Sequence, residues 1–205
     1  MLLGRKVPKL NRVYDAIVRQ GGDALLYPLD LQGATPDDYA DMAERIENSL
    51  GRLDGVLHVT AAFPGLTPLE NTDPAAFAQA IHVNLTARWW LTQACLPLLR
   101  KAEDSAIVFA VDAPERSSCA YWGGYGVAQA ANASLIRMLH AELAASPVRV
   151  AGLAPKPMRT PLRSRAYVED SAADALEPAR YAPACVALLS AAGAEHCGEV
   201  WEPVL

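Results

Sequence analysis

Residues 105–134 read SAIVFAVDAPERSSCAYWGGYGVAQAANAS, and the change of pattern within this stretch decides the fold. It begins with a short apolar run at 107–111 that is rich in β-branched residues, as expected for a strand buried on both faces. A polar loop over 112–118 ends the strand. From Tyr121 onward the segment is helical in pattern, with apolar residues at helical spacing: Leu135, Met138, Leu139 and Leu143.

The rest of the chain alternates in the same way between strand-like and helix-like segments. Strand-like runs lie at 1–5, 24–30, 53–61, 146–155 and 198–201, and helices are expected around 10–17, 36–50, 74–100 and 181–192. Thr35-Pro36 and Asp73-Pro74 are typical helix starts, with a capping side chain before a proline. This order predicts one domain over 1–205, an α/β three-layer sandwich with a mostly parallel sheet and helices on both faces.

Composition narrows the class of protein. With 205 residues, the chain is long enough for one well-buried domain, and its net charge of −5 argues against a nucleic-acid surface. No apolar run reaches the roughly 18 residues of a membrane span, and no signal peptide is visible. The four cysteines form no CxxC pair, so we expect neither a metal site nor disulfides, and a cytoplasmic location.

The segment around Tyr125 resembles the short-chain dehydrogenase/reductase family. In that family a strand ends at a catalytic Ser, and a Tyr on the next helix is followed four residues later by a Lys. Here Tyr125 follows such a strand, and the preceding residues 121–124, YWGG, are similar to one bacterial branch of the family. The resemblance covers nearly the whole chain. It implies a Rossmann-like fold and an NADP-linked oxidoreductase that moves a hydride between a nicotinamide and a carbonyl or alcohol.

The resemblance assigns four positions to the catalytic site, and two of them hold a different residue type. Tyr125 stands at the family's Tyr position, Asp112 at its Ser position and Gln129 at its Lys position. Asn84 matches a helix-breaking Asn that holds a water in a proton relay through the Lys.

The two replacements act against a Tyr acid or base. An unperturbed Tyr phenol has a pKa of about 10, so about 0.1% is phenolate at neutral pH. A Lys lowers this pKa by its positive charge, whereas the neutral amide of Gln129 does not. An ionised Asp112 would raise the pKa, and it cannot donate a hydrogen bond to a substrate oxygen as a Ser hydroxyl can.

Three further positions match cofactor-binding residues of the family. Arg5 stands where NADP-preferring members hold the 2′-phosphate, since a guanidinium matches phosphate bidentately. Asp30 matches an acidic residue near the adenine, and Thr160 matches a Thr that contacts the nicotinamide amide. Ordinary surface roles at strand ends are the alternatives for Arg5 and Asp30. Lys156 replaces a family Gly, and its side chain either fills space that a cofactor would need or points to solvent.

Other positions depart from the family pattern. The motif at 2–5, LLGR, corresponds to the end of the family's second strand, so we expect this chain to lack the first strand, the Gly-rich turn and the first helix. Residues 59–61 read VTA where the family has Asn-Ala-Gly. Three alternatives follow for the missing strand. The family's second strand pairs directly with its fourth, or the sheet has an unpaired edge that another segment must cover, or the gene product begins upstream of Met1. We expect direct pairing of Leu2–Gly4 with Leu53–Thr60 in a six-stranded sheet.

Three functions remain open from the sequence. The main reading is a catalytically impaired or inactive family member that serves as a dimerising or binding module, a homodimer or homotetramer formed through the 74–100 and 121–145 helices. The alternative is an active NADP(H)-dependent carbonyl reductase or alcohol dehydrogenase that uses Tyr125. The third is a small-molecule binder that reuses the substrate cleft. Separately, the resemblance implies that 161–175 correspond to the family's substrate lid. Arg159, Arg163 and Arg165 are interpreted as a solvated loop face.

Overall fold

A computed structural model describes residues 1–167 and 175–204 of the chain. The strands that it contains are β1 (Leu2–Gly4), β2 (Leu26–Pro28), β3 (Gly55–His58), β4 (Ser105–Ala110), β5 (Val148–Leu153) and β6 (Val200–Trp201). The α-helices are α1 (Val7–Arg19), α2 (Pro36–Leu50), α3 (Pro74–Ile81), α4 (Ala87–Leu99), α5 (Pro114–Ser117), α6 (Gly123–Glu142), α7 (Pro161–Ala166) and α8 (Ala182–Leu189). Strands and helices alternate along most of the chain, as the sequence predicts.

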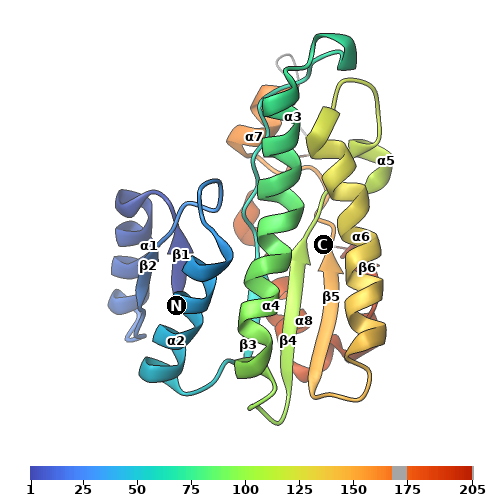
Figure 1. Cartoon of the computed structure of the whole chain (residues 1–205). Coiled ribbons are helices and arrows are strands. Elements are labelled where there is room, and N and C mark those ends of the chain that lie inside the picture. Colours follow the sequence, from blue (N-terminus) through green and yellow to red (C-terminus); the bar gives the residue numbers. More distant parts are fainter. Residues whose placement is uncertain (168–174, 205) are drawn as a thin grey trace.

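Every strand pair in the described part of the chain is parallel, which confirms the predicted parallel α/β fold. The strands form one sheet in the order β3-β4-β5-β6 and a separate pair, β1-β2. The expected direct pairing of β1 with β3 in a six-stranded sheet is therefore wrong. Figure 1 shows β1 and β2 with α1 and α2 standing beside the four-stranded sheet, joined to it through packing rather than strand hydrogen bonds.

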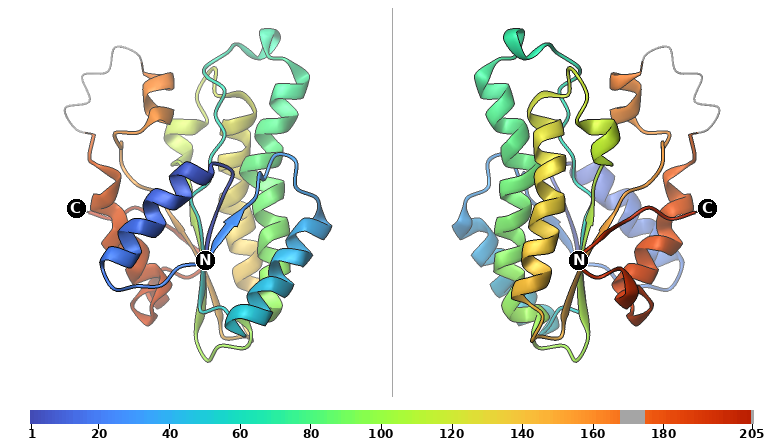
Figure 2. Two further views of the ribbon diagram at one scale, coloured as in Figure 1. Left: turned by 90° about the vertical axis from the view of Figure 1, so that its left-hand side faces the viewer. Right: turned by 90° about the vertical axis from the view of Figure 1, so that its right-hand side faces the viewer.

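The two faces of the four-stranded sheet are covered by different helices, which makes three layers. α4 and α6 lie on one face with α2 beside them, and α8 lies on the other face together with α1 (Figure 2). Side chains of β4 alternate between the two layers. Ile107 and Phe109 join the core under α4 and α6, whereas Val108 packs with Leu188 of α8. This burial on both faces explains why β4 is apolar throughout.

The side chains of α2 tie the β1-β2 unit to the main core. Tyr39, Met42 and Ile46 lie on one stripe of α2 and are almost fully buried against residues of α4. Leu3 and Tyr27 of the two short strands pack at the edge of the same core. Apolar packing therefore joins the two sheets where backbone pairing does not.

The long helix predicted over 74–100 is present, but its middle is a π-helical turn at His82–Thr86 between α3 and α4. Asp73 caps α3, because its carboxylate accepts hydrogen bonds from the amides of Ala75 (3.3 Å) and Ala76 (3.1 Å). Within the turn, the Asn84 side chain donates to the Ala80 carbonyl at 2.8 Å, the same carbonyl that an α-helical Asn84 amide would use. This competition accounts for the turn at Asn84.

None of the helices in 1–167 and 175–204 combines the length and apolar character that crossing a bilayer requires.

Candidate active site

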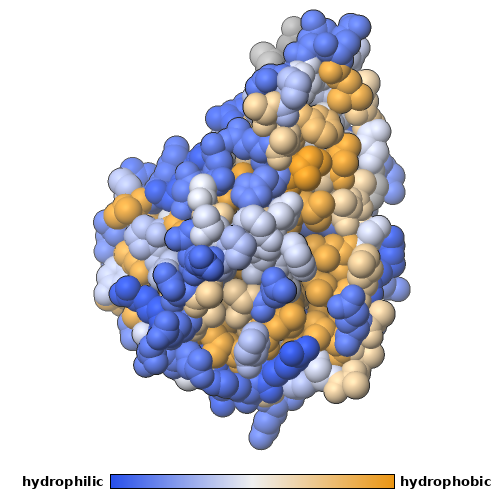
Figure 3. Space-filling model, in the orientation of Figure 1, coloured by the Kyte–Doolittle hydropathy of each residue, from blue (hydrophilic) through white to orange (hydrophobic). Residues whose placement is uncertain are grey.

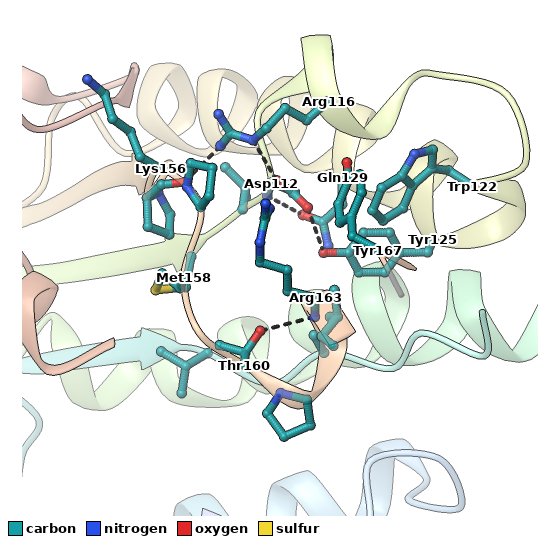
Figure 4. A pocket seen from close by; sticks show the side chains of 18 of the residues that line it. Asp112, Arg116, Trp122, Tyr125, Gln129, Lys156, Met158, Thr160, Arg163 and Tyr167 are labelled. Atoms are coloured by element: carbon teal, nitrogen blue, oxygen red, sulfur yellow. Dashed lines mark hydrogen bonds and ion pairs between the residues drawn. The ribbon is translucent and has the colours of Figure 1, made fainter. Parts of the chain in front are cut away.

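A cavity of about 470 Å³ lies at the carboxyl ends of the strands β3, β4 and β5. Its wall is formed by the loops that follow these strands, by the first turns of α6 and by α7, and Figure 4 shows the side chains that surround it. Ligands of open parallel sheets bind outside the carboxyl ends of the strands. Three of the predicted catalytic residues line this cavity together with one predicted cofactor residue: Tyr125, Asp112, Gln129 and Thr160.

Tyr125 and Asp112 are in direct contact inside the cavity. The Tyr125 hydroxyl donates a hydrogen bond to Asp112 Oδ2 at 3.3 Å. Gln129, one turn further along α6, does not reach the phenol: its Oε1 accepts from the backbone amide of Asp112 at 3.0 Å. Gln129 thus fixes the start of the loop after β4, while Asp112 fixes the Tyr125 hydroxyl.

The phenol of Tyr125 stays protonated in this environment. Burial raises its pKa well above the ordinary value, and the nearby charge of Asp112 raises it further. Positive charge on Arg88 and Arg116 lowers the pKa, but it does not offset the first two effects. The site therefore presents Tyr125 as a neutral hydrogen-bond donor rather than as a phenolate.

Asp112 is held in place by a cation that the sequence analysis did not single out. Arg116 of α5 donates from Nε to Asp112 Oδ1 at 3.2 Å and from Nη2 to the Pro155 carbonyl at 2.7 Å. Its Nη1 also contacts Glu202 at 3.3 Å. The helix α5 thereby links the loops after β4 and β5, and Asp112 has an ion-pair partner at the same time as it accepts from Tyr125.

A second cation, Arg88, lies under the cavity. It sits on the first turn of α4, is 1% exposed and lines the cavity. Its Nη1 donates to the Ala110 carbonyl at 2.9 Å, and its Nη2 donates to the Thr60 carbonyl. Burial lowers the pKa of Arg88 to about 10, so the side chain is charged at neutral pH. The sequence does not indicate that Arg88 lines the cavity, because it is a lone arginine in a helix of mainly apolar residues.

The predicted cofactor residues fall in two places. Thr160 lines the cavity and caps α7, since its Oγ1 accepts from the Arg163 amide at 3.2 Å. Arg5 and Asp30 lie outside the cavity and form an exposed ion pair of 3.9 Å across the carboxyl ends of β1 and β2. Lys156 is exposed, and its side chain extends away from Asp112 and Tyr125 (Figure 4), so it does not fill the space next to the phenol.

Asn84 is placed elsewhere and braces the wall of the cavity. Its Oδ1 accepts from the Ala62 amide at 2.9 Å, and its Nδ2 donates to the Ala62 carbonyl at 2.7 Å. Asn132 of α6 donates to the backbone carbonyl of Asn84 at 2.9 Å. With both ends of its amide used by backbone groups, Asn84 acts here as a support for the loop after β3.

The three arginines interpreted as a solvated face have separate environments. Arg163 lines the cavity, so this interpretation is wrong for it. Arg165 is exposed, although it donates to the Phe63 carbonyl at 3.0 Å, and Arg159 is exposed beside Glu177. Of the expected lid at 161–175, α7 covers 161–166, and 168–174 lie outside the described residues.

The charges around the cavity suit an anionic ligand such as a nicotinamide dinucleotide phosphate. Within 1–167 and 175–204, five cations line it against one carboxylate, that of Asp112: Lys9, Arg88, Arg116, Lys156 and Arg163. The buried Nε of Arg88 has no hydrogen-bond acceptor among the described residues. The residues present thus fit the phosphate-bearing cofactor that the family uses. No cluster of His, Cys, Asp or Glu within the described ranges is suited to a metal ion.

Comparison with known proteins agrees with this geometry. A family model described as enoyl-(acyl carrier protein) reductase matches residues 5–197. An uncharacterized oxidoreductase of Escherichia coli K12, YciK, is 31% identical over 184 residues, which are 89% of this chain and 73% of YciK.

Solved structures extend the likeness to the whole fold. A protein from Pseudomonas syringae assigned as a short-chain dehydrogenase superposes with a TM-score of 0.93 at 34% identity, covering 98% of this chain and 82% of that one. One from Escherichia coli CFT073, described as complexed with NADPH, has a TM-score of 0.92 at 30% identity and covers 98% and 84%. Cavity, fold and sequence agree, and this chain belongs to the short-chain dehydrogenase/reductase family.

Proposed function

We propose that this protein is an NADP(H)-linked oxidoreductase that interconverts a carbonyl compound and an alcohol in the cavity beside Tyr125. The observation that supports this most directly is the Tyr125 hydroxyl, a protonated donor in a cation-lined cavity at the carboxyl ends of the strands. A related structure described as complexed with NADPH makes this cofactor the first to test. Bound there, the nicotinamide would supply or accept the hydride.

The contact between Tyr125 and Asp112 offers a way for the phenol to work without ionising. As a substrate alcohol gives its proton to the phenol oxygen, the phenol proton can pass to Asp112 Oδ2, with which it is already hydrogen-bonded. In the reductive direction the two transfers reverse. Asp112 then provides a proton acceptor, where the family's Lys provides a positive charge, and Arg116 orients the carboxylate.

A carboxylate relay also predicts slow catalysis. A carboxylate is a weaker base than an amine, so little of the driving force for proton removal is available at neutral pH. The substrate oxygen must further compete with Asp112 for the single proton of the Tyr125 hydroxyl. We therefore expect turnover well below that of a Tyr activated by a Lys.

The same contacts favour a second candidate function, a binding module without turnover. Tyr125 and Gln129 both direct their polar groups to Asp112 rather than to the cavity centre. Exposed apolar side chains on α4 and α6, Trp89, Val127 and Met138, support self-association through these helices. Figure 3 shows apolar surface gathered over this part of the molecule.

Binding and turnover, measured separately, distinguish the two candidates. NADPH is titrated into the purified chain by calorimetry, and its oxidation is then followed with a panel of aldehydes and ketones. The oxidoreductase proposal expects binding, slow turnover and loss of turnover in Tyr125→Phe, with Tyr121→Phe, an exposed site, as control. Binding without turnover supports the binding module. Absence of NADPH binding at millimolar cofactor contradicts the proposed cofactor itself.

A further inference from the structure

We propose that Arg88 forms a binding site for an anionic group of the substrate, so that the reacting carbonyl compound or alcohol carries a carboxylate close to the carbon that changes oxidation state. The redox part of this statement rests on the proposed function. The binding part stands on the geometry of Arg88 alone.

Arg88 has hydrogen-bonding capacity that the protein leaves unused. A guanidinium has five N–H groups. Carbonyl acceptors, Ala110 at 2.9 Å and Thr60, anchor Nη1 and Nη2, whereas Nε is buried and has no acceptor. The two anchored nitrogens bridge the ends of β4 and β3, so the guanidinium is held in one orientation at the cavity wall. Because Arg88 lines the cavity, its guanidinium, which is fixed at the wall and has unused donor capacity, is suited to receive a ligand oxygen.

The charge of Arg88 is also uncompensated by the residues around it. No ion pair joins Arg88 to a carboxylate in the part of the chain that the structure describes. Asp112, the only carboxylate among the described residues that line the cavity, is engaged by Arg116 and Tyr125. His58, a buried titratable group on which the charge of Arg88 acts, is neutral because burial lowers its pKa to about 3. A buried charge is normally paired, so an anion supplied by the ligand would complete the site.

The backbone places this anion site next to the reacting hydroxyl. Arg88 is anchored to the carbonyl of Ala110, and the Tyr125 hydroxyl is bonded to the side chain of Asp112, two residues further on. Arg88 and Tyr125 both line the cavity, and the charge of Arg88 acts on the Tyr125 phenol. A small molecule whose carboxylate is one or two bonds from its carbonyl carbon can therefore reach both groups at once. This geometry points to oxo acids and hydroxy acids as the substrate class.

Oxamate and its uncharged isostere oxamide provide the test in the unaltered protein. Calorimetric titration of the full chain should show oxamate binding and oxamide binding at least about tenfold more weakly, the effect of losing one charge-assisted hydrogen bond in a buried site. Equal binding of the two compounds, or failure of oxamate to bind, overturns the proposal. Because the readout is binding, a protein without turnover can still confirm the anion site, which separates this proposal from the oxidoreductase one.

Variants of Arg88 then locate the anion site. Arg88→Gln removes the charge but keeps donors for the Ala110 and Thr60 carbonyls, and should weaken oxamate about tenfold or more. Arg88→Lys keeps the charge and should restore most of the affinity, which a purely structural role would not do. Arg137→Gln, at an exposed position of α6, is the control. Loss of NADPH affinity in Arg88→Gln with oxamate binding unchanged would assign Arg88 to the cofactor phosphates and overturn the proposal.

Discussion

Asp112 helps to keep Tyr125 protonated. Its carboxylate accepts a hydrogen bond from the Tyr125 hydroxyl, and its negative charge raises the pKa of the phenol. Asp112→Asn removes that charge, and burial alone then keeps the pKa high. We expect Tyr125 to titrate at lower pH in this variant, seen as one additional tyrosinate in a near-ultraviolet absorbance titration. The additional step should vanish in Asp112→Asn with Tyr125→Phe. An unchanged titration of the single variant would show that Asp112 does not act on the phenol.

The ion pair of Asp104 and Arg149 makes stability depend on pH at the opposite end of the sheet. Arg149 donates to both carboxylate oxygens at 2.7 and 3.0 Å, and this contact lowers the pKa of Asp104. A lowered folded pKa gives stabilisation that is present above the unfolded pKa of about 3.9 and is lost as the pH falls through the folded value. Because Asp104 is half exposed, Asp104→Asn should cost about 0.5 to 1 kcal/mol at neutral pH.

Urea unfolding at two pH values measures this contribution. The difference between wild type and Asp104→Asn should shrink at acidic pH, where the wild-type carboxylate is protonated. Asp41→Asn, at an exposed position within α2, is the control and should show no such convergence. A difference that is the same at both pH values would mean that the ion pair contributes no pH-dependent stability.

Helix α3 depends on the residue that precedes it, since Asp73 satisfies two amides that have no partner within the helix. Asp73→Ala should reduce the free energy of unfolding by about 1 kcal/mol. The urea midpoint, compared with that of Asp41→Ala inside α2, measures the effect. If the two variants have equal stability, the cap is replaced by water at no cost.

Helix α6 packs on α5 through a glycine. A Cβ on Gly126 would overlap the Ser117 carbonyl oxygen, so Gly126→Ala must push α5 and α6 apart. We expect a loss of about 1 to 3 kcal/mol in stability. The variant should also weaken ligand binding, because α5 carries Arg116 and α6 carries Tyr125. Gly33→Ala, where a Cβ meets only open space, is the matched control, and similar behaviour of the two would contradict this packing.

The whole molecule consists of two hydrogen-bonded sheets held together by side chains. Since β1 and β3 share no backbone pairing, the β1-β2 unit can open without breaking the four-stranded sheet. Native-state hydrogen exchange should therefore show faster exchange for the β1 amide of Leu2, bonded to Leu25, than for amides in β4 and β5. Equal protection in the two sheets would show that they open as one cooperative unit.

The sequence predicts the parallel α/β order and the helix caps, because these depend on local pattern. The meeting of Tyr125, Asp112 and Gln129 is expected from the resemblance to the family. The sequence does not predict how strands pair. The expected contact of β1 with β3 is not formed: the two strands lie in separate sheets, which are joined through core side chains such as Tyr39 and Met42 of α2.

The sequence also could not predict which cationic side chains line the cavity. Arg88, Arg116 and Arg163 come from α4, α5 and α7, and no spacing rule connects them. Tertiary packing decides which arginine side chains face the cavity. Arg88 has an exposed neighbour, Trp89, and the π-helical turn before it fixes which of the two faces the core.

The π-helical turn also determines how the cavity can open. Asn84 bonds both backbone groups of Ala62, and Arg88 bonds the Thr60 carbonyl, so the wall after β3 moves only with the helix that runs from α3 into α4. α7, on the opposite side, contacts that wall through the Arg165 bond to the Phe63 carbonyl and through the packing of Ala166 and Leu162 with Phe63. A ligand in the cavity therefore lies between one wall that is braced by a network of hydrogen bonds and another that is held mainly by apolar contacts.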